Sequence, residues 1–74
     1  MDIVLYSKDN CDFCNRSKIL LDMKSKTYSV KMLDVDYTLE QLKELVPTAR
    51  NFPVIFIDDK YIGGYNELRT SISW

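Results

Sequence analysis

The feature that most constrains this chain of 74 residues is its single pair of cysteines, Cys11 and Cys14. They follow a run of strand-forming residues at 3–6 and begin a helix-forming run that continues to about residue 26. If the strand turns directly into a helix here, Cys11 lies at the helix N-terminus. Cys14 then lies one turn inside, on the same side of the helix. Two thiols in this arrangement are able to close a disulfide ring.

The two cysteines are expected to differ in environment. Free backbone amides and the positive end of the helix dipole favour a thiolate at Cys11, whose sulfur we expect to be exposed. Cys14 is shielded by its own helical turn and should remain a thiol. The pattern therefore predicts an attacking cysteine, Cys11, and a resolving cysteine, Cys14.

Composition excludes several other kinds of site. The chain has no histidine, which excludes Ser-His and Cys-His nucleophile pairs and histidine-based metal sites. Two cysteines do not complete a four-ligand zinc site within one chain, so we expect no metal. A carboxylate-assisted site, or one shared between two chains, remains an alternative. Basic and acidic residues are mixed along the chain and the net charge is −1, so neither nucleic acid nor an anionic membrane is an expected partner.

The length predicts one domain spanning residues 1–74. A strand pattern starts directly after Asp2, so we expect no secretion signal, and no apolar run approaches the roughly 18 residues of a membrane span. We therefore expect a cytoplasmic protein. In that compartment a Cys-x-x-Cys pair indicates redox chemistry or metal binding more than a structural staple.

The first half of the chain predicts a strand, a helix and a second strand. The first strand covers residues 2–6, residues 7–10 form a loop, and Asn10 or Cys11 caps a helix that runs to about residue 24. Alternation over residues 28–34 indicates an edge strand. A strand, a crossover helix and a second strand form a right-handed unit with parallel strands.

The second half predicts two helices around a hairpin. Thr38 and Gln41 match a capping box, and Pro47 should stop that helix near residue 45. Four of its residues are expected to face inward: Leu39, Leu42, Leu45 and Val46. Strands at 54–57 and 60–62 flank an Asp58-Asp59 turn, and a last helix capped by Asn66 runs to Trp74. The order is β-α-β-α-β-β-α.

Four separated pieces of the sequence resemble glutaredoxins. They are Tyr6-Ser7-Lys8, Cys11-x-x-Cys14, a Pro53 that opens an apolar strand, and Gly63-Gly64 followed by a polar helix start. The resemblance covers nearly the whole chain. It implies an α/β, thioredoxin-like (glutaredoxin) fold, with a four-stranded mixed sheet flanked by helices and a cis Phe52-Pro53 bond.

The same resemblance implies a binding site for glutathione as a co-substrate. Lys8 and Arg50 would hold its glycine carboxylate, and the Phe52 backbone beside Pro53 would pair with its cysteine. Lys8 would also stabilise negative charge at Cys11, and Phe13 would supply an aromatic wall. The γ-glutamyl end would meet backbone amides that Gly64 lets come close. These amides lie around Tyr65, Asn66 and Glu67.

Some residues depart from the family pattern or have a plainer interpretation. The commonest family motif is Cys-Pro-Tyr-Cys, whereas this chain has Cys11-Asp12-Phe13-Cys14. Phe52 replaces a smaller residue before the proline, and Asn66 replaces a common Asp or Ser. Lys8 also fits an ordinary solvated lysine, and Arg50 fits a plain surface charge equally well.

The resemblance implies a monomeric glutathione-dependent thiol-disulfide oxidoreductase, active in cell redox homeostasis. Its partners would be disulfide-containing or glutathionylated proteins, with ribonucleotide reductase one candidate by family association. Three alternatives stay open. They are a hydrogen-donor redoxin recharged by thioredoxin reductase, a dimer that bridges a [2Fe–2S] cluster through Cys11 of each chain and two glutathiones, and a thiol-dependent binding module.

Overall fold

The computed structural model describes residues 2–49 and 51–72. Their order is β-α-β-α-β-β-α, as predicted. The elements are β1 (Ile3–Ser7), α1 (Asp12–Met23), β2 (Ser29–Met32), α2 (Leu39–Leu45), β3 (Val54–Ile57), β4 (Lys60–Gly63) and α3 (Tyr65–Ser71). None of the helices in this described part is long and apolar enough to cross a membrane.

The four strands form one mixed sheet in the order β2-β1-β3-β4. Strand β1 runs parallel to β2, with Leu5 opposite Val30, and antiparallel to β3, with Leu5 opposite Ile55. Strands β3 and β4 form a hairpin whose turn residues, Asp58 and Asp59, have φ angles of 52° and 66°. Positive φ at both turn residues is the geometry that suits a two-residue hairpin.

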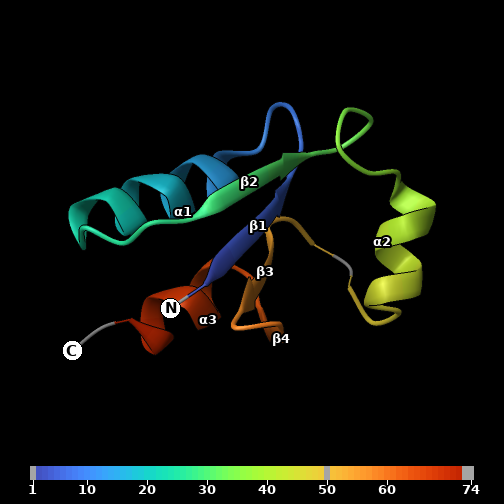
Figure 1. The fold of residues 1–74 in the computed structure, drawn as a ribbon. Helices are drawn as coiled ribbons and strands as arrows, with labels where there is room; N and C mark the ends of the chain where they lie inside the picture. Colours follow the sequence, from blue (N-terminus) through green and yellow to red (C-terminus); the bar gives the residue numbers. More distant parts are fainter. Residues whose placement is uncertain (1, 50, 73–74) are drawn as a thin grey trace.

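Helices cover both faces of the sheet (Figure 1). One core lies on the side of α1 and α3 and consists of Ile3, Leu5, Leu21, Ile55, Leu68 and Ile72. The other lies on the side of α2 and consists of Tyr37, Leu42, Val46 and Val54. Because side chains alternate along a strand, β1 contributes to both cores. Its C-terminal end and the start of α1 lie where the cysteines are.

Helix α2 begins and ends where the sequence predicts, but its buried face is narrower. The capping box is present: the Thr38 backbone N–H donates to Gln41 Oε1 (2.9 Å), and the Gln41 backbone N–H donates to Thr38 Oγ1 (3.2 Å). Leu42 is buried, whereas Leu39 is 45% exposed and Leu45 is 53% exposed. The expectation that these two leucines face inward is therefore wrong, because this two-turn helix contacts the sheet along one narrow line.

Two further boundaries differ from the sequence prediction. Ser7 is not in the loop but is the last, buried residue of β1. Asn66 is not a cap: α3 begins at Tyr65, and Gly64 is its N-cap. The predicted extension of this helix to Trp74 falls outside the described residues.

Tyr37 contacts the end of β1 from the face of the sheet that α2 covers. Its hydroxyl donates to the carbonyl oxygen of Ser7 (2.7 Å), and its ring lies 5.0 Å from the ring of Tyr6 in an edge-to-face contact. The side chain is 6% exposed. Burial, with Tyr6 and Asp34 nearby, raises the pKa of Tyr37 to about 12.

This raised pKa predicts a loss of stability at alkaline pH that depends on Tyr37. In the unfolded chain a tyrosine titrates near about 10, so between that pH and about 12 the folded protein keeps a proton that the unfolded chain has lost. Stabilisation is therefore present below about pH 10 and lost as pH rises, by up to about 1.4 kcal/mol per pH unit. Urea unfolding at several alkaline pH values should show that the free energy of unfolding declines less steeply with pH in Tyr37→Phe than in the wild type. Equal slopes in the two proteins would contradict this prediction.

Candidate active site

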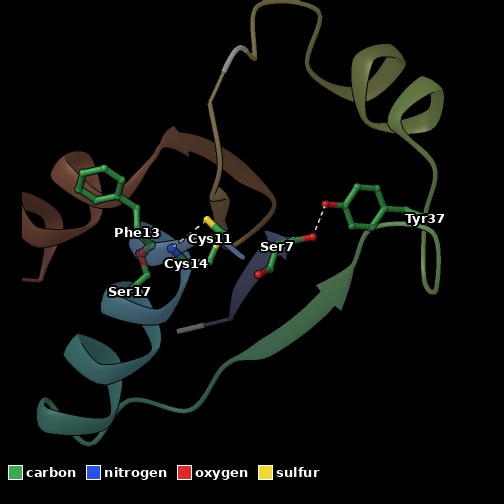
Figure 2. Close-up of a disulfide and its surroundings, with 6 residues drawn as sticks. All are labelled: Ser7, Cys11, Phe13, Cys14, Ser17 and Tyr37. Atoms are coloured by element: carbon green, nitrogen blue, oxygen red, sulfur yellow. Dashed lines mark hydrogen bonds between the residues drawn. A yellow bond between two sulfur atoms is a disulfide. The ribbon is translucent and has the colours of Figure 1, made fainter. Parts of the chain in front are cut away.

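The cysteine pair occupies the first turn of α1. Cys11 is the N-cap, with φ −117° and ψ 102°, and Cys14 lies within the helix. Their Cα atoms are 5.2 Å apart and their sulfurs form a disulfide, shown with its surroundings in Figure 2. The Cys14 backbone N–H donates to Cys11 Sγ (3.1 Å). An amide at the start of the helix thus points at the sulfur of Cys11, which is the contact that favours a thiolate there.

The two cysteines differ in exposure less than the sequence predicts. Cys14 is 1% exposed, as expected for the resolving position, but Cys11 is only 8% exposed. In the disulfide form Cys11 is therefore a buried residue and not the exposed one predicted, because its sulfur is bonded to that of Cys14 and accepts the Cys14 backbone N–H. Cys11 nevertheless lines a surface groove.

This groove has a volume of about 1180 Å³. Its lining includes most of the site residues predicted from the sequence, namely Lys8, Cys11, Phe13, Phe52, Gly64, Tyr65, Asn66 and Glu67. It also includes residues not predicted for the site, among them Asn10, Leu39, Lys43, Ala49 and Tyr61. The sequence pattern does not predict that α2 contributes to the groove, because it places the leucines of this helix in the core. The available signal is the position of Leu39 at the start of a short helix.

Phe52 forms one side of the groove, whereas the predicted site residue Pro53 is buried behind it and does not line it. The bond between them is cis, as the resemblance implies, and Pro53 is buried. The ammonium of Lys8 stands over the Phe52 ring, 5.2 Å from its centroid. This cation–π contact keeps the positive charge of Lys8 at the groove. Arg50, the second predicted partner of a carboxylate, falls outside the described residues.

The opposite side is built by α3 and the first turn of α1. The Phe13 side chain is 50% exposed, and its ring lies 5.9 Å from the ring of Tyr65. The guanidinium carbon of Arg16 lies 5.3 Å from the Phe13 centroid. Phe13 and Tyr65 thus lie next to each other in the lining of the groove.

Glycines allow α3 to begin close to the sheet. A Cβ at Gly64 would lie 3.3 Å from the carbonyl oxygen of Pro53, so little room exists for a side chain. Gly63 has a φ of 119°, which favours glycine. The Glu67 carboxylate accepts the Gly64 backbone N–H (2.8 Å), so that amide already has a partner.

The charges of the groove are divided between its two sides. Lys8 and Lys43 lie on the side of β1 and α2, whereas Asp12 and Glu67 belong to α1 and α3. An extended zwitterionic peptide matches this division. Within the described part of the chain, no three His, Cys, Asp or Glu side chains gather into a metal site.

Comparison with known proteins places this geometry in a family. The glutaredoxin family model matches residues 3–62. Glutaredoxin 3 of Escherichia coli K12 is 33% identical over 69 residues, which cover 90% of this chain and 81% of that protein.

Two solved structures are similar as well. The reduced E. coli glutaredoxin has a TM-score of 0.82 and 25% identity, covering 99% of this chain and 94% of that one. A buckwheat glutaredoxin–glutathione complex has a TM-score of 0.75 and 30% identity, covering 88% of this chain and 62% of that one. The disulfide at the start of α1, the fold and the family match agree: the chain belongs to the glutaredoxin family, as a thiol-disulfide oxidoreductase with a redox-active Cys11–Cys14 disulfide.

Proposed function

We propose that the protein reduces protein disulfides and glutathione mixed disulfides at the expense of glutathione. The observation that carries this proposal is the groove at Cys11, with a lysine on one side and the start of α3 on the other. A similar protein, the buckwheat glutaredoxin, forms a complex with glutathione. The protein partners would be disulfide-containing or glutathionylated proteins, with ribonucleotide reductase one candidate. The protein would act on them as a monomer in the cytoplasm.

With a glutathionylated protein, the proposed reaction uses Cys11 alone. The Cys11 thiolate attacks the glutathione sulfur, a new Cys11–glutathione disulfide forms, and the target leaves as a thiolate that takes up a proton. A second glutathione thiolate then attacks the glutathione sulfur of this intermediate. Glutathione disulfide is released and the Cys11 thiolate returns.

With a protein disulfide, the proposed reaction needs both cysteines. Cys11 forms a mixed disulfide with one target sulfur, and Cys14 then attacks Cys11 and displaces the target as a dithiol. Two glutathiones reduce the resulting Cys11–Cys14 disulfide. The short distance between the two Cα atoms, 5.2 Å, supports this second step.

In the proposed complex, glutathione lies along the groove as an extended chain. Its glycine carboxylate meets Lys8, joined by Arg50, and its cysteine pairs with the Phe52 backbone beside Pro53. Its γ-glutamyl carboxylate meets backbone amides at the start of α3, around Tyr65 and Asn66. Since the Gly64 amide is held by Glu67, we propose that Glu67 faces the γ-glutamyl ammonium.

The electron source separates this proposal from a redoxin recharged by thioredoxin reductase. The oxidised protein should be reduced by glutathione with glutathione reductase and NADPH, and only slowly by thioredoxin reductase with NADPH. Faster reduction by thioredoxin reductase than by glutathione would instead identify the protein as a redoxin recharged by thioredoxin reductase.

Replacement of Lys8 should weaken the binding of glutathionylated substrates. Loss of one partly solvated charge contact of about 0.7–1.4 kcal/mol predicts a KM about three- to tenfold higher for Lys8→Gln. Lys43→Gln is the matched control, since this lysine also lines the groove but comes from α2, and its KM should change less than about twofold. Steady-state kinetics at low and high salt measures both. The Lys8 effect should shrink as salt screens it, and equal effects of the two substitutions would contradict the proposed contact.

A further inference from the structure

The hydroxyl of Ser7 is buried at the end of β1 without a partner. Ser7 is 1% exposed, and among the described residues its Oγ is the one buried side-chain oxygen or nitrogen that makes no hydrogen bond. Its backbone carbonyl, in contrast, accepts from the Leu33 N–H (2.9 Å) and from the Tyr37 hydroxyl (2.7 Å). The backbone at the end of β1 is therefore held by hydrogen bonds, and only the hydroxyl of Ser7 has no hydrogen-bond partner. A buried hydroxyl without a hydrogen bond is costly, so this group calls for an explanation.

The position of Ser7 directs this hydroxyl toward Cys14. Ile3, Leu5 and Ser7 alternate along β1 and share one face, on which Ile3 and Leu5 pack with Leu21 of α1. Only residues 8–11 separate β1 from the first turn of α1, which carries the buried Cys14. Figure 2 agrees: the Ser7 hydroxyl lies on the side of β1 that faces the disulfide, away from its carbonyl and Tyr37.

The redox state of the cysteines changes what this hydroxyl is able to bind. A sulfur within a disulfide has no proton and is a weak acceptor, whereas a thiol also has an S–H donor and a thiolate is a strong acceptor. We propose that Ser7 is a positioning residue, whose hydroxyl forms a hydrogen bond with the Cys14 sulfur once the disulfide opens. It accepts from the Cys14 thiol in the reduced protein and donates to the Cys14 thiolate in the resolving step. The group that is unpartnered in the oxidised protein then becomes partnered in the reduced one.

The contact would act in the resolving step. Cys14 loses its thiol proton, and its thiolate attacks Cys11 in a mixed disulfide with the target. The Cys11–Cys14 bond forms, the bond from Cys11 to the target breaks, and the departing target thiolate takes up a proton. Ser7 keeps its own proton throughout. It holds the Cys14 thiolate in a site that water does not reach, because Cys14 is 1% exposed.

The test is the reduction potential of Ser7→Ala in a dithiothreitol redox buffer, which does not depend on glutathione binding. Removing the hydroxyl should make the reduced form less favourable by about tenfold, which is about 30 mV more negative for a two-electron couple. Ser7→Thr, which keeps the hydroxyl, should stay within about twofold of the wild type.

Ser17→Ala is the matched control. This serine is also fully buried, on α1 beside Cys14, but its hydroxyl already donates to the Phe13 carbonyl (2.8 Å). Because that bond is internal to the helix, its loss should move the potential by less than about twofold in the equilibrium constant.

Unfolding in urea of both redox forms completes the test. Ser7→Ala should destabilise the reduced form and leave the oxidised form as stable as the wild type or more so. A potential unchanged by Ser7→Ala, or equal destabilisation of the two forms, would overturn the proposal and leave Ser7 as an ordinary packing residue. So would a shift of the same size in Ser17→Ala.

Discussion

Cys11→Ser is expected to abolish glutathione-dependent reduction of a small mixed disulfide, whereas Cys14→Ser should retain most of it. A serine hydroxyl is not ionised at neutral pH, so loss of the attacking thiolate should lower the rate by at least about three orders of magnitude. The proposed deglutathionylation does not use Cys14. Both rates are measured by coupling glutathione disulfide formation to glutathione reductase.

The fold itself should tolerate Cys11→Ser. Cys11 is the N-cap of α1 and its sulfur accepts the Cys14 backbone N–H (3.1 Å), a contact that a serine hydroxyl also makes at N-caps. Inactivity of Cys11→Ser would therefore report on chemistry and not on unfolding. Far-ultraviolet circular dichroism of the reduced proteins is the control.

A protein disulfide as the substrate should reverse the behaviour of Cys14→Ser. Without the resolving thiol, the mixed disulfide between Cys11 and the target persists, and mass spectrometry should find the trapped pair. If Cys14→Ser were as inactive as Cys11→Ser on the small mixed disulfide, the assignment of Cys11 as the sole attacking residue would be wrong.

The parts of the fold that were predictable are those set by local chemistry. Apolar runs gave the strands, the Thr38–Gln41 box fixed the start of α2, and Pro47 fixed its end. The Cys-x-x-Cys spacing at a strand-to-helix junction located the disulfide. Each of these signals depends on residues within about one turn of one another, which is why the sequence carries them.

What the sequence did not reveal depends on contacts between distant segments. The sequence predicts Ser7 in a loop because it follows a run of apolar residues, although its spacing of two from Leu5 fits the inward face of a strand. It is buried in the folded chain, and its carbonyl accepts from the hydroxyl of Tyr37, 30 residues away. Asn66 has the chemistry of a cap, but the hairpin that ends at Gly63 fixes where α3 begins.

The second large effect is the loss of stability expected when the buried leucine of α2 is replaced. The same leucine-to-alanine substitution is possible at a buried and at an exposed position of this helix. Leu42→Ala should destabilise the protein by about 2–5 kcal/mol, the usual range for a buried leucine. Leu42 is 2% exposed and packs with Tyr37, Val46 and Val54. A domain of this length has a stability of roughly 4–11 kcal/mol, so this one change removes a large share of it.

Leu45→Ala is the control that separates burial from sequence pattern. The helical pattern assigns Leu45 to the same inward stripe, yet its side chain is 53% exposed, so the cost should stay below about 1 kcal/mol. Both variants keep the intrinsic helix preference, since alanine is the best helix former. Urea unfolding of the two oxidised proteins therefore measures packing alone. Equal losses would mean that α2 packs with a wider face than the structure has, with Leu45 buried as well as Leu42.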